Sequence, residues 1–315
     1  MIYNQLGSTD IRVSKMCFGS LTLGPLQANL QLEEGSKVIK EAFNSGVNFI
    51  DTAQLYETYP YIKEALKDFK REDIIISTKS YAYDTKTAKE AFESACHELG
   101  TDYIDVFMLH EQESEHTVRG HYQALEYYMK LKKEGYIRAI GLSTHCIDGV
   151  KAVNKYSEFD IVHPIFNKAG LGIQGGDIND MIRELTTFKS NGGGIFAMKP
   201  LGGGNLLHSI DECFDFVLAS QLIDSFAIGM QSVDEVISNV CRVTGKIIPK
   251  EVATRLKNKQ RKLVVADWCT GCSKCVERCR SGGITLIDGL ATPNENCILC
   301  GYCAPVCPDF CIKVI

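Results

Sequence analysis

The chain lacks several features that would set it apart from ordinary globular enzymes. None of its apolar runs approaches the roughly 18 residues needed to cross a bilayer, and residues 1–6 lack the layout of a signal peptide. Lysine and arginine (34) do not outnumber aspartate and glutamate (39), and the net charge is -5. The basic excess of a nucleic-acid-binding protein is therefore missing. We expect a cytoplasmic protein whose partners include neither a membrane nor nucleic acid.

Tryptophan is scarce, with Trp268 as the only one, whereas cysteine is abundant at 14 in 315 residues. Five of the cysteines are scattered through apolar or helical contexts, where small buried thiols are expected: Cys17, Cys96, Cys146, Cys213 and Cys241. All the others fall between Cys269 and Cys311. Such crowding in a cytoplasmic protein favours a metal site over disulfides.

The crowded cysteines form the run CxxCxxCxxxC twice, and a proline follows the second run. This spacing resembles that of bacterial ferredoxins with two 4Fe-4S clusters, in which the fourth cysteine of each run binds the other cluster. It predicts one cluster on Cys269, Cys272, Cys275 and Cys307. It predicts a second cluster on Cys297, Cys300, Cys303 and Cys279. Two zinc sites are the alternative, although zinc motifs seldom repeat a triple spacing.

The cysteine runs predict a two-domain chain, with a barrel over residues 1–262 and a ferredoxin-type α+β domain over residues 263–315. A segment this short buries little core, so cluster binding should supply most of its folding free energy. We expect Cys311 to be a spare thiol beside the second cluster. Trp268 is expected to pack on a cluster or on the barrel.

Before the cysteine runs, strand and helix patterns alternate without interruption. A hairpin over residues 2–14 precedes them, with its turn at residues 6–10. Strands are predicted at 15–18, 47–50, 74–78, 104–109, 137–142, 161–167, 195–199 and 225–229. Helices are predicted at 32–45, 61–69, 85–99, 121–133, 148–156, 178–188, 210–219 and 233–243, with one more at 249–261. Eight such pairs indicate an α/β fold that closes into a TIM (β/α)8 barrel. The short loops predict a pocket that is open above.

Proton-handling side chains stand at successive strand ends, which in a parallel barrel meet on one face. Asp51 ends one strand and Tyr56 follows in the loop, Lys79 ends the next strand, and His110 ends the third. Each has an ordinary structural alternative: a helix cap for Asp51, rim packing for Tyr56, solvation for Lys79 and core packing for His110. Their convergence favours a catalytic site.

In this order the four residues resemble the Asp, Tyr, Lys, His tetrad of the aldo-keto reductases. The resemblance implies hydride transfer from NAD(P)H to a small-molecule carbonyl substrate while Tyr56 protonates the oxygen. Lys79 would favour the phenolate of Tyr56, Asp51 would hold the ammonium, and His110 would orient the substrate. The whole chain resembles the aldo-keto reductases that carry a C-terminal ferredoxin-type domain.

A glycine-rich loop follows the seventh strand, where barrels commonly hold phosphate. It contains Lys199, Pro200, Leu201, Gly202 and Gly203. The family resemblance adds further nicotinamide-cofactor contacts at Gly19, Ser20, Ser143, Thr144, Asn167, Gln231, Ser232, Glu235 and Asn239. Met198 and His163 depart from the family pattern. Since no Lys or Arg lies near Ser232 in the sequence, the choice between NADP(H) and NAD(H) stays open.

A basic run, which contains Lys257, Lys259 and Arg261, has two interpretations: a solvated face, or a docking patch for an acidic electron-carrier protein. The leading functional hypothesis is an NAD(P)H-dependent carbonyl reductase with clusters for electron transfer. One alternative is a nicotinamide-binding redox sensor. The other is a ferredoxin-driven reductase in which the clusters feed electrons directly to the barrel site.

Overall fold

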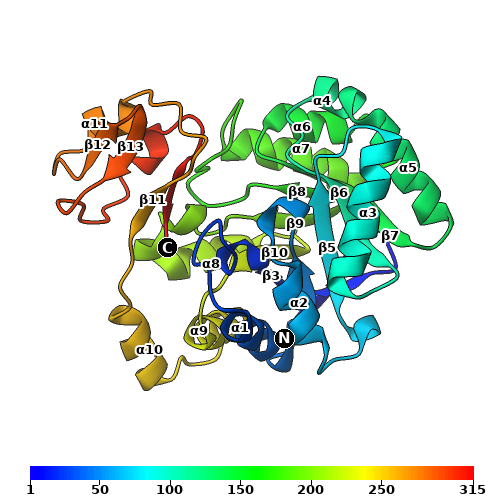
Figure 1. The fold of residues 1–315 in the computed structure, drawn as a ribbon, viewed down its shortest axis with the longest axis horizontal. Helices are drawn as coiled ribbons and strands as arrows, with labels where there is room; N and C mark the ends of the chain where they lie inside the picture. The colour runs from blue at the N-terminus through cyan, green and yellow to red at the C-terminus, as the bar shows by residue number, and fades with distance from the viewer.

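The computed structural model describes residues 1–315 and contains a closed barrel of eight parallel strands. Around the barrel the order is β10, β3, β4, β5, β6, β7, β8, β9. The strands are β3 (Met16–Gly19), β4 (Phe49–Asp51), β5 (Ile75–Ser80), β6 (Ile104–Leu109), β7 (Ile137–Thr144), β8 (Ile161–Pro164), β9 (Gly194–Met198) and β10 (Ser225–Gly229). The predicted barrel is therefore confirmed. Its helices cover the outside of the strands (Figure 1).

The outer helices are α1 (Leu32–Asn44), α2 (Tyr59–Leu66), α3 (Thr85–Leu99), α4 (Glu115–Gly120), α5 (Tyr122–Lys133), α6 (Ile147–Val153), α7 (Ile178–Ser190), α8 (Ile210–Ala219), α9 (Val233–Thr244) and α10 (Lys250–Lys257). One of them, α4, was not predicted. Its N-cap is Ser114, and Thr117 Oγ1 of the first turn accepts the N–H groups of Ser114 (3.1 Å) and Glu113 (3.0 Å). The predicted strand at 161–167 was too long, since β8 ends at Pro164, which has no N–H for a ladder.

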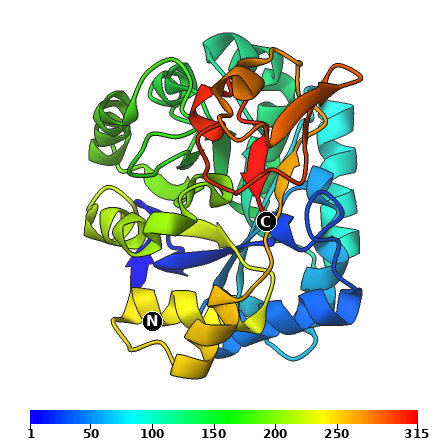
Figure 2. The same ribbon diagram turned by 90° about the vertical axis from the view of Figure 1, so that its left-hand side faces the viewer.

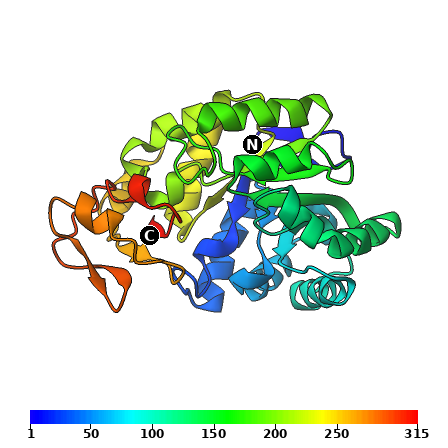
Figure 3. The same cartoon turned by 90° about the horizontal axis from the view of Figure 1, so that it is seen from above.

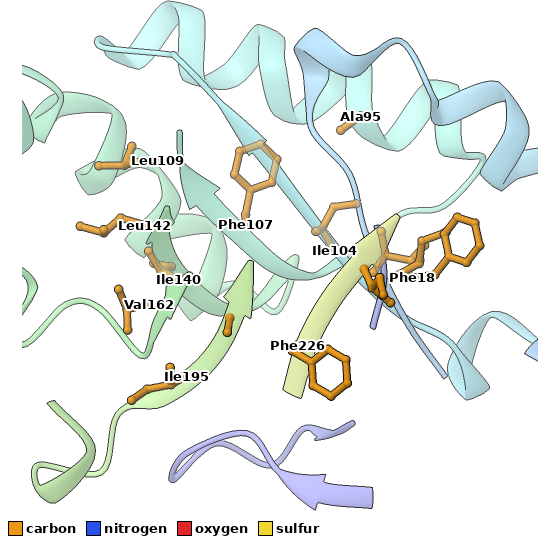
Figure 4. Close-up of a cluster of buried hydrophobic side chains, with 14 of the residues drawn as sticks. Phe18, Ala95, Ile104, Phe107, Leu109, Ile140, Leu142, Val162, Ile195 and Phe226 are labelled. Carbon is orange, nitrogen blue, oxygen red and sulfur yellow. The ribbon is translucent and has the colours of Figure 1, made fainter. Parts of the chain in front are cut away.

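Two apolar layers fill the barrel domain. Between strands and helices, side chains such as Phe107, Leu142 and Ile195 project from the strands into one large core (Figure 4). Inside the barrel a second layer of buried side chains closes the amino-terminal end. The predicted hairpin contributes to it: β1 (Tyr3–Gln5) pairs antiparallel with β2 (Arg12–Ser14), and Leu6 and Ile11 are fully buried.

The hairpin turn is fixed by a close backbone approach. Gly7 has φ 59°, and its N–H donates to Asp224 Oδ2 at 3.1 Å. A Cβ atom at Gly7 would lie only 2.3 Å from the backbone nitrogen of Gly194. Only glycine therefore allows this hairpin, which plugs the amino-terminal end of the barrel, to approach the barrel so closely.

The C-terminal segment forms a small unit at one side of the barrel (orange to red in Figures 2 and 3). It has two antiparallel pairs: β11 (Leu263–Val265) with β14 (Ile312–Val314), and β12 (Ile284–Ile287) with β13 (Leu290–Pro293). A short helix, α11 (Lys274–Arg278), contains Cys275, and the 3-10 helix η6 (Ala304–Val306) follows Cys303, the corresponding cysteine of the second run. Each half of the segment thus contributes one strand to each pair.

None of the helices combines the length and apolar character that a membrane crossing requires.

The close approach at the plug gives a stability prediction. We expect Gly7→Ala to destabilise the fold by about 2 kcal/mol more than Gly135→Ala, because the new methyl group meets backbone atoms that cannot move away. Gly135 is the matched control: it also has positive φ (86°), but nothing lies within 4 Å of its added Cβ. Urea denaturation of the two variants measures the difference. Equal shifts of the midpoint would contradict the steric role of Gly7.

Candidate active site and cysteine cage

The structure brings the four predicted catalytic residues together at the carboxyl end of the barrel. Asp51 is the last residue of β4, Lys79 lies in β5, and His110 directly follows β6. Tyr56 ends the 3-10 turn η2 (Gln54–Tyr56) after β4. Three neighbouring strands therefore supply the group, as the strand-end pattern predicted.

Lys79 and Asp51 form a buried ion pair beneath Tyr56. Lys79 Nζ donates to Asp51 Oδ1 at 2.9 Å and to Oδ2 at 2.8 Å, and its third bond goes to the carbonyl of Thr52 at 2.7 Å. All three ammonium protons are satisfied, which a buried charge requires. The Lys79 side chain is 1% exposed. The pair is consequently fixed in one geometry.

Tyr56 lies above this pair, with Lys79 Nζ 4.9 Å from its ring centroid. Burial raises the pKa of the Tyr56 phenol well above its usual value, and the negative charges of Asp51 and Glu111 raise it further. Burial is the largest of these effects, and the Asp51 carboxylate that pairs with Lys79 opposes the influence of its ammonium on the phenol. Tyr56 is a protonated phenol at neutral pH.

His110 packs edge-on against Tyr56, with ring centroids 5.6 Å apart. Burial lowers the pKa of His110 well below its usual value, and the nearby charge of Lys79 acts in the same direction. Its Nδ1 atom is buried and makes no hydrogen bond in the structure. A neutral imidazole with an unused polar atom is a group that a ligand can satisfy. Of the two tyrosines beyond Lys79, Tyr81 stacks on His110 at 4.4 Å, whereas Tyr83 is exposed.

A cleft of about 460 Å³ extends from Tyr56 and Asp51 along the top of the barrel. Its walls include many of the residues predicted to bind the cofactor. These are Gly19, Lys199, Pro200, Leu201, Gly203, Gln231, Glu235 and Asn239. His163 and Met198, the two departures from the family pattern, also line it. The cleft is thus continuous from the tetrad to α9.

Other predicted cofactor residues lie outside this lining and bond within the protein. Ser20 pairs with Thr58 (2.7 Å), and Ser143 Oγ accepts the N–H of Glu111 (2.9 Å). Asn167 Nδ2 donates to the carbonyl of Lys199 (3.3 Å), which fixes the start of the glycine-rich loop. The remaining three are likewise absent from the cleft walls: Thr144, Gly202 and Ser232.

The far end of the cleft contains cations that the sequence alone did not place there. Lys259 Nζ donates to Glu235 Oε1 at 2.7 Å and to Gln231 Oε1 at 3.1 Å. Lys257 and Arg261 line the same end. The expectation of no cation near Ser232 holds along the sequence but is wrong in the folded protein, because the segment after α10 folds back over α9. The basic run faces the cleft and is not merely a solvated surface.

The pocket is also less open than the short loops predicted. Lys313, Val314 and Ile315 of the C-terminal segment line it. The glycine-rich loop makes this possible: a Cβ at Gly204 would lie 2.0 Å from the carbonyl oxygen of Val314. The backbone of this loop at Gly204 therefore packs directly against β14.

The cysteine runs converge across the two halves of the C-terminal segment. One small cavity is lined by all four cysteines of the first predicted site: Cys269, Cys272, Cys275 and Cys307. In the second set, burial raises the pKa of Cys303 to about 11, and Cys297 and Cys300 are close enough to raise it further. Cys279 and Cys297 both pack on Gly283, where an added Cβ would lie 2.5 Å from the Cys297 Cα atom.

Backbone geometry around the cysteines repeats between the two runs. The N–H of Gly283 donates to Cys279 Sγ, and the N–H of Cys311 donates to Cys307 Sγ, both at 3.2 Å. The second cysteine of each run also lies between two residues of left-handed backbone. These are Gly271 (φ 65°) and Ser273 (φ 67°) in the first run, and Leu299 (φ 55°) and Gly301 (φ 77°) in the second. Donors aimed at sulfur favour the thiolate form.

Two predictions about this segment need correction. Cys311 lines the cavity of the first cysteine set, not the second, because it follows Cys307 in the turn that bonds to it. Trp268 is 56% exposed and is held by a hydrogen bond to the carbonyl of Asp309 (3.2 Å), so it does not pack on the barrel. No group of three or more His, Cys, Asp or Glu side chains has the arrangement of a metal-ion site.

Comparison with known proteins places the chain in a family. The family model described as "Aldo/keto reductase family" matches residues 15–265. L-galactose dehydrogenase of Arabidopsis thaliana is 24% identical over 280 residues, covering 76% of this chain and 87% of that protein. NADH-specific methylglyoxal reductase of Escherichia coli (strain K12) is 29% identical over 183 residues, covering 50% of this chain and 56% of that protein.

A solved aldo-keto reductase from Bacillus halodurans, in its holo form, superposes with a TM-score of 0.66 at 22% identity. The superposition covers 82% of this chain and 96% of that chain, which establishes a shared fold. The family match spans most of the sequence and includes the whole strand-end site. The chain therefore belongs to the aldo/keto reductase family, and it is an NAD(P)-dependent oxidoreductase.

Proposed function

We propose that this protein reduces a small carbonyl compound with NAD(P)H, using Tyr56 as the proton donor. The single observation that carries the proposal is the unsatisfied Nδ1 of His110 beside Tyr56, which itself lines the end of the long cleft. A carbonyl oxygen that reaches these two side chains would meet polar groups able to bond to it.

Each residue of the tetrad has a separate task in this proposal. Tyr56 gives its phenolic proton to the oxygen as the carbonyl is reduced. His110 orients that oxygen through its ring nitrogen, and the Lys79–Asp51 pair supports Tyr56 from below. The preformed arrangement is electrostatic preorganisation, because these side chains are already in position before the proton is transferred.

We propose that the nicotinamide cofactor lies along the cleft from Tyr56 towards Glu235 and Asn239, where its role is to supply the hydride. The lining residues Gly19, Lys199 and Gln231 would contact it. Those outside the lining would act by shaping the loops that do, as Asn167 does through its bond to Lys199. The methylglyoxal reductase named above is described as NADH-specific. In this chain, Lys259 could contact the 2'-phosphate that distinguishes NADPH from NADH, but it is already paired with Glu235. The charge of Lys259 alone therefore does not favour either cofactor.

We further propose that residues 263–315 form a ferredoxin-type domain whose two cysteine sets hold 4Fe-4S clusters, separate from the barrel over residues 1–262. The support is that Cys307 shares a cavity with three cysteines of the first run, which is the crossed arrangement of the predicted first site. Bound clusters would supply one-electron transfer, and an electron-carrier protein would be the external partner. The N–H donors to Cys279 and Cys307 would stabilise their thiolates.

A second candidate is a ferredoxin-driven reductase, in which the clusters feed electrons directly to the barrel site. It is favoured by one contact: Phe310, three residues after Cys307, lies 4.9 Å from Lys199 Nζ in the cleft wall. Anaerobic turnover with dithionite and no NAD(P)H would distinguish it from hydride transfer. A redox-sensor role would instead leave binding of NAD(P)H intact without any turnover.

We expect Tyr56→Phe to lower carbonyl reduction by at least about a hundredfold, because the only suitably placed proton donor is lost. Binding of NAD(P)H, followed by fluorescence titration, should change little. Tyr83→Phe is the matched control, since that phenol is 58% exposed and lies outside the cleft. Turnover retained by Tyr56→Phe would remove the phenol from the proton donor's role.

The pH dependence follows from the two shifted groups. Tyr56 must be protonated and its pKa is raised above 10.0, so alkaline loss of activity begins only above that value. His110 must be neutral and its pKa is lowered below 6.5, so acid loss begins only below that value. We expect kcat/KM for reduction of a neutral aldehyde, which presents no anion to Lys199 or Lys313, to stay level between these two pH values. If kcat/KM, measured with saturating cofactor, changed with pH inside that range, the roles assigned to Tyr56 and His110 would be contradicted.

Anaerobically prepared protein should contain about eight irons and eight inorganic sulfides per chain. Cys272→Ser should lower the iron content by about half, because it removes one ligand of the first set. Cys96→Ser is the control, since Cys96 lies in α3, packs against the barrel core and is outside the apolar cluster that contains Cys275 and Cys303. Iron and zinc analysis measures both, and stoichiometric zinc without iron would exclude the clusters.

A further inference from the structure

Two lysines from different parts of the chain meet at the wall of the cleft. Lys199 directly follows β9, and Lys313 lies in β14 of the C-terminal segment. Lys313 Nζ lies 3.3 Å from the ring centroid of Phe310, and Lys199 Nζ lies 4.9 Å from the same centroid. Both lysines line the cleft that contains Tyr56. They therefore bring two ammonium groups to one side of the proposed reaction site.

These ammonium groups have few anionic partners. Lys199 Nζ lies 2.7 Å from His145 Nε2, and Lys313 Nζ donates to the backbone carbonyl of Phe310. The acid that acts on both is Glu111, whose carboxylate already accepts the hydroxyl of Tyr81 and lies 3.6 Å from His145. No carboxylate forms an ion pair with either lysine. When these lysines are protonated, the protein therefore offers neither of them an ion pair.

Burial makes this arrangement costly unless something neutralises it. Burial lowers the pKa of Lys199 to about 8, and it lowers the pKa of Lys313 to about 6 with help from the neighbouring charge of Lys199. Two ammonium groups that share one partly desolvated wall repel each other when both are charged. An anion bound beside both would favour their charged forms and would accept charge-assisted hydrogen bonds.

The position of Lys313 is held by the barrel. Asn205 Nδ2 donates to the carbonyl of Ile312 at 3.0 Å, and Gly204 leaves room for the backbone of Val314. The strand that carries Lys313 is thus bound to the same loop that follows Lys199. A receptor built this way is complete only when the C-terminal segment is in place.

We propose that Lys199 and Lys313 form an oxyanion receptor for a carboxylate or a phosphate group, assembled across the barrel and the C-terminal segment. This inference rests on the proposed function for one point only, namely which molecule carries the bound anion. One source of the anion is an acidic group on the carbonyl substrate. The other is the pyrophosphate of the nicotinamide cofactor. Both sources present the same chemistry to the two lysines.

The receptor is tested first by binding, without any turnover. Inorganic pyrophosphate is titrated into the full-length protein by calorimetry, for the wild type, Lys199→Gln and Lys313→Gln. We expect each substitution to weaken binding by about tenfold or more, because each removes one charged donor. Lys313→Arg should retain binding. Lys246→Gln is the control, since Lys246 is exposed and lies outside the cleft, and it should bind like the wild type.

Kinetics then separate the two sources. Succinic semialdehyde carries a carboxylate, and butanal is a neutral aldehyde of the same length. If the substrate supplies the anion, the kcat/KM ratio of the charged to the neutral aldehyde falls about tenfold in Lys313→Gln, and the dissociation constant of NAD(P)H does not change. If the cofactor supplies the anion, the dissociation constant of NAD(P)H rises instead and the ratio is constant.

Two results would overturn the receptor. One is pyrophosphate affinity that neither lysine substitution changes. The other is a Lys313→Gln variant that binds pyrophosphate like the wild type but loses iron or alters its visible spectrum. Lys313 would then balance the negative charge of the cysteine sites instead of binding an oxyanion. A protein that binds pyrophosphate through both lysines but reduces neither aldehyde would disprove the proposed function and leave the receptor standing.

Discussion

The buried ion pair of Lys79 and Asp51 is the interaction around which the active end of the barrel is organised. It joins β4 to β5 and uses every proton of the ammonium. Because removal of one partner would leave an uncompensated buried charge, the pair constrains its neighbours strongly. The protonated Tyr56 and the neutral His110 both follow from this arrangement and from burial.

The second constraint is the contact between the glycine-rich loop and β14. Glycines that would leave room for a phosphate also leave room for another backbone, and here Gly204 receives Val314. The C-terminal segment consequently becomes part of the cleft wall and brings Phe310 and Lys313 close to Lys199. This contact gives a physical reason for both units to share one chain, since the barrel's cleft is completed by the segment that carries the cysteines.

The unpredicted residues of the site fall into two groups. Glu111 and His145 stand at strand ends, directly after His110 and Thr144, so the strand-end rule could have found them. Lys259 and Lys313 could not be found in that way. Each reaches the cleft because a segment far along the chain folds back over the barrel. Sequence proximity therefore gave the wrong answer for the cations near Ser232.

The sequence by itself determined the barrel, the plug hairpin and the placement of the tetrad, because strand and helix periodicities and strand-end positions are local properties. The paired cysteine runs were also visible in the sequence, because the spacing between residues can be read directly from it. Only the tertiary structure decided the direction in which the pKa of Tyr56 shifts, because burial and the charges of Asp51 and Glu111 raise it. It likewise decided that Lys199 and Lys313 meet, because charges separated in sequence interact only where folding brings them within a few ångströms of each other.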